Sequence, residues 1–237
     1  ADRYLLVVNA ANTDKDLAHL QEQIKAFDAR MTVITADVAA IAVQGPKSKD
    51  ILKTLAGGGE LTAENVKNSL GTLTMEGKPV RVAKTGYTGE PIGYELYCDS
   101  ADAVYFWNRL VELGARPTGL GARDTLRMEA ALPLYGHEMG PCQLGGEIQA
   151  YASPLAKFAV SFNADKGDFV GREPLRKQFE ALKKILNRDW SSNEDLPYRI
   201  YPICLLGRGV LRAGFPVYDA RNGEELGYVT SGTMIPY

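Results

Sequence analysis

Apolar residues in the first part of the chain follow two different spacings. Residues 4–8 and 31–35 are short apolar runs, and each predicts a buried strand. Between them, apolar residues recur every three or four positions from residue 17 to residue 27, which is the spacing of one helical face. Thr13, followed three residues later by Asp16, is typical of a helix start. The order strand, helix, strand is typical of half of an α+β sandwich.

The middle of the chain predicts a sheet packed against helices. Four apolar or alternating segments predict strands, at residues 39–43, 72–75, 80–84 and 94–97. Helical spacing predicts one helix over residues 47–55, which three glycines end. A later helix is expected to bury four residues, namely Val104, Trp107, Leu110 and Val111.

The pattern changes after Gly140. Residues 140–153 are rich in loop-forming residues, and residues 183–198 are polar enough to predict an exposed excursion. Further strands are expected at residues 158–162, 200–206 and 228–231. We therefore expect a boundary near residues 145–150 and a small all-β domain after it.

Both ends of the chain predict strands without neighbours. A strand at residues 4–8 has nothing upstream to pair with, and a strand entering a turn at residues 229–233 has nothing downstream. Because unpaired strand edges are a liability, we expect a fragment of a longer protein.

Composition excludes several classes of function. The chain has 237 residues with 27 Lys and Arg against 29 Asp and Glu, so it lacks the basic excess typical of nucleic-acid binders. Three cysteines without a Cys-x-x-Cys pair and two histidines predict no metal site. No apolar run is long enough for a signal peptide or a membrane span, so we expect a cytoplasmic protein that does not bind membranes.

Glu95, at the start of a predicted strand, is the first candidate for ligand binding. An ionised carboxylate accepts two parallel N–H donors in a fork, and the amino edge of a pterin presents such a pair. The alternative is an ordinary strand carboxylate that faces solvent or pairs with a lysine.

A loop tyrosine and two arginines complete the candidate site. Tyr87 stands between glycines, where it could stack on a flat ring, or it is a turn tyrosine packed on its own sheet. Arg123 and Arg127 lie one turn apart on a predicted helix and repel each other unless an anion is near. That anion is either an acidic ligand tail or nearby Asp124 and Glu129.

Two further residues have weaker support. His137, two residues after Tyr135, could move a proton, or it is a satisfied polar residue. Asn9 directly follows a predicted strand and either meets a ligand edge or caps a turn.

Taken together, these motifs resemble the T-protein family of the glycine cleavage system, which are tetrahydrofolate-dependent aminomethyltransferases. The resemblance extends over nearly the whole chain, and two of its motifs are specific. They are Thr85-Gly-Tyr-Thr-Gly-Glu90 and Gly119-Leu-Gly-Ala-Arg-Asp-Thr-Leu-Arg127. Weaker matches follow in the family's order at Val43-Gln-Gly-Pro46, Tyr135-Gly-His-Glu138, Phe169-Val-Gly-Arg-Glu173, Gly209-Val-Leu-Arg212 and Thr230-Ser-Gly-Thr233.

The resemblance implies an α+β fold of three parts. Residues 1–38 would be part of a ferredoxin-like segment, residues 39–147 a folate-binding α+β domain and residues 148–237 part of a C-terminal β-barrel. It implies that Tyr87 and Glu95 meet the pterin, that Arg123 or Arg127 and Tyr135 line the pocket, and that Asn9 approaches it. Arg212 would orient the lipoyl side.

The implied reaction moves an aminomethyl carbon from the lipoyl arm of the H-protein to tetrahydrofolate, a co-substrate, and releases ammonia. The family's catalytic aspartate lies on a segment that would precede residue 1, so the catalytic residue of this chain is unknown. The last part of the barrel, after Thr233, is also missing from the chain. The alternatives are a folate-dependent demethylase of the same fold and a non-catalytic folate-binding protein.

Overall fold

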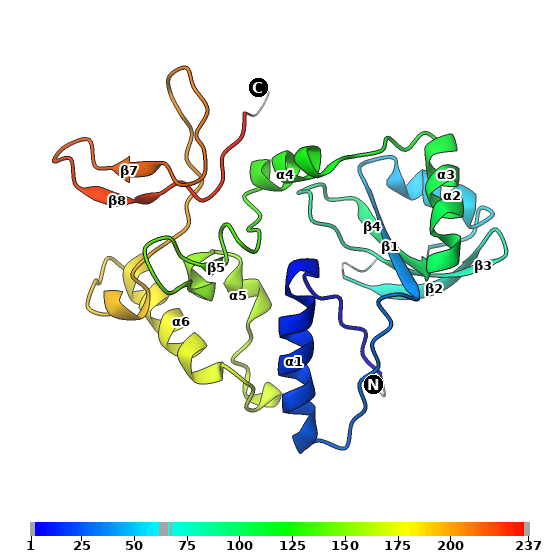
Figure 1. Cartoon of the computed structure of the whole chain (residues 1–237), viewed down its shortest axis with the longest axis horizontal. Helices are drawn as coiled ribbons and strands as arrows, with labels where there is room; N and C mark the ends of the chain where they lie inside the picture. Colours follow the sequence, from blue (N-terminus) through cyan, green and yellow to red (C-terminus); the bar gives the residue numbers. More distant parts are fainter. Residues whose placement is uncertain (1–2, 62–65, 67, 235–237) are drawn as a thin grey trace. The chain divides into compact units, whose positions relative to one another are not determined.

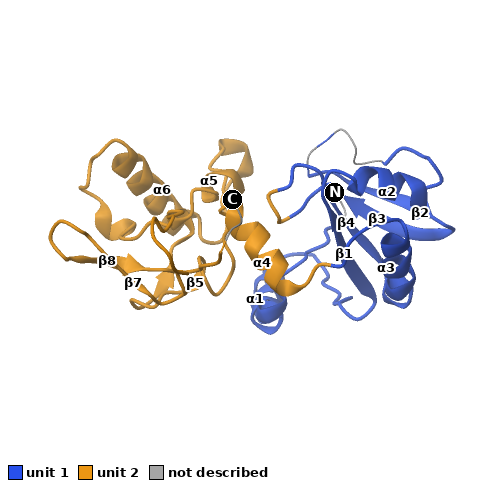
Figure 2. Ribbon diagram, turned by 90° about the horizontal axis from the view of Figure 1, so that it is seen from above, with its two compact units in different colours: residues 1–86, 90–117 blue, residues 87–89, 118–237 orange. Residues whose placement is uncertain are grey.

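The computed structural model describes residues 3–61, 66 and 68–234, and it divides into two compact units. The first unit comprises Ala1–Gly86 and Glu90–Pro117, and the second comprises Tyr87–Gly89 and Thr118–Tyr237 (Figure 2). This division differs from the three parts expected above, which remain a prediction. We describe each unit by itself.

The first unit begins with a helical segment instead of strands. Two 3-10 turns, η1 (Ala10–Asn12) and η2 (Ile24–Ala26), flank helix α1 (Thr13–Gln23). The strands expected at residues 4–8 and 31–35 are wrong, because both segments are irregular. The apolar side chains of residues 4–8 are exposed, and no described strand offers them an edge. The described residues before Val38 therefore give no support for the ferredoxin-like segment.

The α+β fold itself is confirmed by a four-stranded antiparallel sheet in the first unit (Figure 1). Its strands are β1 (Val38–Gln44), β2 (Leu70–Met75), β3 (Lys78–Ala83) and β4 (Gly93–Asp99), in the order β1-β4-β3-β2. Strands β2 and β3 form a hairpin with a two-residue turn that has positive φ at Glu76 and Gly77. Positive φ at both central residues matches the right-handed twist of the strands.

Helices α2 (Ser48–Leu55) and α3 (Ala103–Glu112), the latter preceded by η3 (Ser100–Asp102), cover one face of this sheet. Phe106 and Leu110 of α3 pack into the core, whereas Trp107 stays 46% exposed. The expectation that Val104, Trp107 and Val111 are buried is wrong, because the buried face of α3 passes through positions 106 and 110. The core consists of Val43, Leu52, Leu55, Leu61, Met75, Val80, Val82, Tyr94, Leu96, Cys98, Phe106 and Leu110.

The second unit combines helices with two short hairpins. Its helices are α4 (Leu120–Glu129), α5 (Ala156–Ala159) and α6 (Arg172–Leu186), and its 3-10 turns are η4 (Ala150–Ala152), η5 (Ala164–Lys166) and η6 (Asn193–Asp195). Strands β5 (Gly140–Pro141) and β6 (Glu147–Ile148) form one hairpin, and β7 (Pro216–Tyr218) and β8 (Glu225–Tyr228) form the other.

Several expectations for this unit are wrong. Residues 158–162 begin in α5 and continue as irregular chain. Residues 200–206 are irregular, and all of them except the partly buried Ile200 are exposed. Residues 183–198 are not wholly exposed, because α6 runs through Leu186 and Leu196 is buried with Tyr151 and Leu182. From residue 147 to residue 234 the described strands are β6, β7 and β8, so the C-terminal barrel is not confirmed and remains a prediction.

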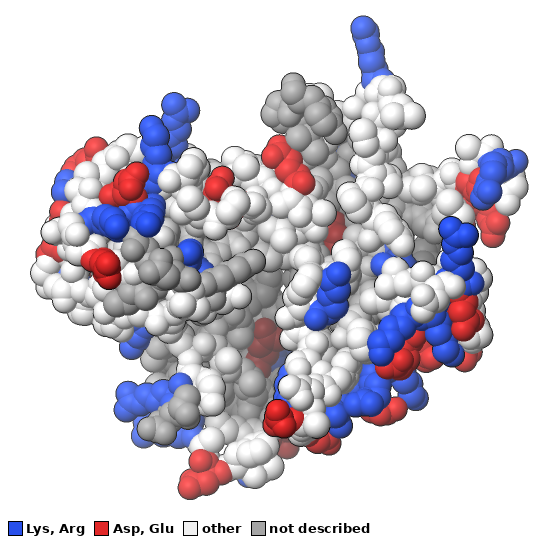
Figure 3. Space-filling model, turned by 180° about the vertical axis from the view of Figure 1, so that it is seen from behind, with Lys and Arg blue, Asp and Glu red and all other residues white. Residues whose placement is uncertain are grey.

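The surface agrees with the balanced composition. On the face drawn in Figure 3, acidic and basic side chains of the described residues are interspersed. None of the helices in the described ranges is both long enough and apolar enough to cross a bilayer.

Candidate functional site

Glu95 lies on the face of the sheet opposite helices α2 and α3. Side chains alternate along a strand, and Tyr94 and Leu96 enter the core beneath α2 and α3, so Glu95 points to the opposite face. Its directly opposite neighbours are Ala42 on β1 and Ala83 on β3. The half-buried carboxylate thus has only a methyl side chain as its neighbour on each adjacent strand.

One oxygen of this carboxylate is held in place. The Tyr97 hydroxyl, two residues along the same face, donates a hydrogen bond of 2.6 Å to Oε2 of Glu95. Burial, together with this hydrogen bond, raises the pKa of Tyr97 well above its usual range, so its hydroxyl remains a donor at neutral pH. Oε1 accepts no hydrogen bond from any residue that the structure describes. Glu95 therefore offers a fixed carboxylate with an open oxygen.

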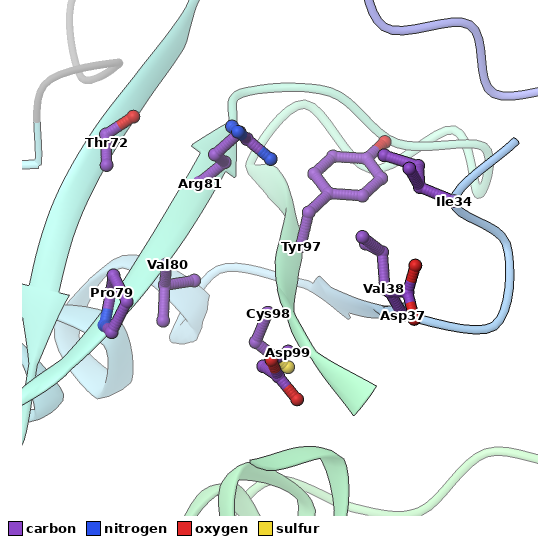
Figure 4. Close-up of a pocket in the computed structure, with 10 residues that line it drawn as sticks. All are labelled: Ile34, Asp37, Val38, Thr72, Pro79, Val80, Arg81, Tyr97, Cys98 and Asp99. Atoms are coloured by element: carbon purple, nitrogen blue, oxygen red, sulfur yellow. The ribbon is translucent and has the colours of Figure 1, made fainter. Parts of the chain in front are cut away.

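Two shallow hollows lie on the first unit beside Tyr97. One has a volume of about 370 Å³ and is drawn in Figure 4, where the Tyr97 ring lies between the side chains of Arg81 and Ile34. The second has a volume of about 240 Å³ and is lined partly by Leu70, Ala83 and Tyr97. Glu95 lines neither hollow, so a ring that reaches its carboxylate would lie over Ala42 and Ala83.

Asn9 of the first unit has a structural contact. Its Oδ1 accepts a hydrogen bond of 3.0 Å from the backbone N–H of Ala11 and so caps η1. The side chain is exposed. Its expected approach to a ligand remains a prediction.

Arg127 of the second unit is 1% exposed and fully bonded. Nε donates to Asp124 at 2.7 Å, and Nη1 donates to Glu138 at 2.7 Å and to the carbonyl of Leu132 at 3.2 Å. Nη2 donates to Ser231 at 2.8 Å and lies 2.6 Å from Asp124. These five contacts match the five donors of a guanidinium, so none remains for a ligand.

Arg123 lies one turn before Arg127 on the same helix but differs from it in burial and in bonding. Its side chain is exposed and has no hydrogen bond or ion pair among the described residues. Of the two arginines expected near an acidic ligand tail, Arg123 is thus the one with available donors.

Glu138 completes the buried cluster. Burial tends to raise its pKa, but hydrogen bonds from Ser231, Thr230 and the backbone N–H of Leu134, with the charge of Arg127, outweigh it and lower the pKa. The carboxylate is therefore ionised when the unit is folded. His137 lies next to this cluster, and its Nδ1 is 3.2 Å from the carbonyl oxygen of Thr230.

The two tyrosines expected at the site both make contacts within the protein. The Tyr87 hydroxyl donates to the carbonyl of Pro133, and burial raises the Tyr87 pKa. The ring of Tyr135 is half-buried and lies where a side chain at Gly140 would collide with it. Arg212 is exposed. The ligand roles of these three residues remain predictions.

Two residues of the site were missed in the sequence. Tyr97 follows Glu95 by two positions in Gly93-Tyr-Glu-Leu-Tyr97, and the period of a strand places both side chains on one face. That signal was available. Ser231 is 104 positions from its partner Arg127, and no local sequence pattern predicts a contact over that separation.

A family model and curated relatives all place this chain among aminomethyltransferase-like sequences. The family model of the GCVT N-terminal domain matches residues 1–148. The aminomethyltransferase of Staphylococcus haemolyticus is 38% identical over 235 residues, which are 98% of this chain and 58% of that protein. The aminomethyltransferase of Moorella thermoacetica is 39% identical over 237 residues, with the same coverage.

A solved structure supports the fold. The glycine cleavage system aminomethyltransferase T of Bartonella henselae superposes with a TM-score of 0.66 at 24% sequence identity, covering 95% of this chain and 55% of that one. The chain thus spans somewhat less than three fifths of the proteins it matches. Because the family model covers more than half of its residues, the chain belongs to the GCVT family.

Proposed function

We propose that this chain binds reduced folate as part of a tetrahydrofolate-dependent aminomethyltransferase of the glycine cleavage system. The observation that carries the proposal is the Glu95 carboxylate, which is fixed by Tyr97 and flanked by two alanines on the sheet face opposite α2 and α3. The similarity to proteins named aminomethyltransferase over 98% of the chain supports it.

The chemistry of the pterin fits this carboxylate. The 2-amino group and the adjacent ring N–H are parallel donors, and one carboxylate accepts both. Hydrogen bonds to a charged group contribute about 1.5–3 kcal/mol each. The methyl side chains of Ala42 and Ala83 suit a flat ring beside Glu95, and Tyr97 keeps the carboxylate from rotating away. In the second unit, Arg123 has free donors that suit an acidic ligand tail.

The proposed reaction starts from an aminomethyl group bound to a sulfur of the lipoyl arm of the H-protein. The N5 and N10 nitrogens of the folate each form a bond to the aminomethyl carbon, whose bonds to the amino nitrogen and to the lipoyl sulfur both break. The two protons that N5 and N10 lose end on the leaving ammonia and on the sulfur. The products are 5,10-methylenetetrahydrofolate, ammonia and the dihydrolipoyl dithiol. The contribution of this chain is to orient the folate, which by itself lowers the barrier by removing rotational and translational freedom.

Glu95→Gln and Glu95→Ala are expected to weaken binding of 5-formyltetrahydrofolate by about 1–3 kcal/mol, because one fork of hydrogen bonds is lost. Isothermal titration calorimetry measures this change directly. Glu225→Gln, which alters an exposed carboxylate on β8, is the matched control and should leave affinity unchanged. Unaltered affinity in both Glu95 variants would refute the assignment of this residue to the pterin.

The reaction class needs its own experiment. Ammonia release from aminomethylated H-protein is measured with and without tetrahydrofolate, using the purified chain. Release that depends on folate supports the aminomethyltransferase, whereas release that is the same with and without folate contradicts it.

A further inference from the structure

Gln44, the last residue of β1, makes contacts that the proposed function does not explain. Its Nε2 donates a hydrogen bond of 3.0 Å to the carbonyl of Tyr94 and one of 3.2 Å to the carbonyl of Thr85. Tyr94 directly precedes Glu95, and Thr85 begins the glycine-bounded loop that returns to β4. One side-chain amide therefore joins the two ends of that loop.

This amide lies where the ladder between β3 and β4 stops. The paired residues are Arg81 to Ala83 of β3 with Tyr97 to Glu95 of β4, and the pairing goes no further than Ala83 and Glu95. Beyond that point the chain segments diverge, and Lys84 bonds instead to Ser69. The Gln44 amide takes the place of the next rung, because it bonds to a carbonyl on each of the two diverging segments.

Two glycines make room for it. A Cβ at Gly86 would lie 1.7 Å from Oε1 of Gln44, and a Cβ at Gly93 would lie 2.2 Å from the same atom. Neither glycine has positive φ, so backbone conformation does not require glycine at either position. The requirement is the space that the carboxamide occupies.

Gln44 shares with Glu95 the sheet face opposite α2 and α3. Val43 is in the core, so its neighbour Gln44 points away from the helices, and Gln44 is paired with Gly93, two positions from Glu95. Two further hydrogen bonds hold the turn that follows Gln44. The N–H of Gly45 donates to Ile92 at 2.9 Å, and the Ser48 hydroxyl donates to Gly45 at 2.7 Å.

We propose that Gln44 is a positioning residue for the folate site. Its carboxamide is a wedge that lies between the two ends of the 85–93 loop and is bonded to both, so it fixes their separation and the edge of the surface next to Glu95. This role rests on the proposed function, since the surface that it shapes is the one assigned to the pterin. Gly86 and Gly93 contribute to this role by leaving space for the carboxamide.

The central test compares variants that remove the wedge by different routes. Gln44→Met keeps the side-chain length but has no donor, and Gly93→Ala leaves Gln44 in place but occupies its space. Each is expected to weaken binding of 5-formyltetrahydrofolate roughly 5- to 30-fold, the value of one to two hydrogen bonds. The double variant Gln44→Ala/Gly93→Ala should bind no more weakly than Gln44→Ala or Gly93→Ala alone, because both substitutions remove the same contact.

Gln44→Glu separates positioning from general loss of stability. An ionised carboxylate facing two carbonyls repels both, whereas its protonated form donates to one of them. The affinity of Gln44→Glu relative to wild type should therefore rise as pH falls, while the ratio for Gln44→Met stays constant. All titrations are made well below the unfolding temperature of each variant, so that only folded protein is compared.

The outcomes distinguish the two proposals. If wild type binds folate and Gln44→Met binds within twofold of it, the wedge is wrong and the proposed function stands. Additive losses in the double variant, or a constant ratio for Gln44→Glu, also overturn the wedge. If wild type binds no folate, the proposed function fails, and the positioning role fails with it.

Discussion

Replacing Arg127 with methionine is expected to lower the free energy of unfolding of the second unit by about 3–5 kcal/mol. Methionine fills part of the volume but leaves Glu138 buried without its cation, and Ser231 and Leu132 lose a donor. An uncompensated buried charge is among the most costly defects in a folded protein. Urea denaturation followed by fluorescence measures the loss. A Trp107→Phe background leaves Trp190 as a reporter within the second unit.

Arg123→Met is the matched control for this prediction. It makes the same change one turn earlier on α4, at an exposed side chain without a partner among the described residues. Its effect on unfolding should stay within about 0.5 kcal/mol. Equal losses in the two variants would contradict the buried cluster, and so would a loss below about 1 kcal/mol for Arg127→Met.

Glu138→Gln is expected to cost about 3 kcal/mol at pH 7, because Arg127 keeps only the half-exposed Asp124 as a charged partner. The amide retains part of the hydrogen bonding but carries no charge. The loss is measured by the same denaturation experiment.

The cost of Glu138→Gln should also depend on pH. The folded-state pKa of Glu138 lies below its ordinary value. Glu138 therefore contributes stability above the pKa of the unfolded chain, and this contribution is lost as pH falls through the folded-state pKa. The difference in unfolding free energy between wild type and Glu138→Gln should thus shrink below about pH 4–5, near the ordinary range of a glutamate. A difference that grows on acidification would contradict the direction of the shift.

The sheet of the first unit was predictable because its signals are local. Alternating residues predicted strands at 39–43 and 94–97, and the structure has Val38–Gln44 and Gly93–Asp99. The helix expected at residues 47–55 is α2, and glycines follow it at the expected place. In each case the spacing of apolar residues and the residues that end the element predict the same secondary structure.

Two of the wrongly predicted strands, at residues 4–8 and 200–206, have a common physical cause. An apolar run such as residues 4–8 indicates a preference for burial, but a strand also needs an edge to pair with. Residues 201–206, which also have no strand edge to pair with among the described residues, are exposed, and Leu206 is 100% exposed. At residues 158–162 the wrong period was inferred, because part of that run belongs to α5.

In the candidate site, too, residues with a local sequence signal were predictable and residues joined by distant contacts were not. Glu95 was predictable from its place on a strand, and Tyr97 could have been found two positions later. The bonded state of Arg127 could not, since Glu138 and Ser231 join it from 11 and 104 positions away. Gln44 was visible only as part of a short motif, because its two partners belong to the ends of a distant loop.

A crystal structure of this chain with 5-formyltetrahydrofolate tests the central claim most directly. The account predicts that the 2-amino group and adjacent ring nitrogen of the pterin lie about 2.7–3.1 Å from the Glu95 carboxylate, the range of charge-assisted hydrogen bonds. It also predicts that the ring lies over Ala42 and Ala83, with Tyr97 still bonded to Glu95. A folate bound elsewhere, with Glu95 facing solvent, would contradict the account.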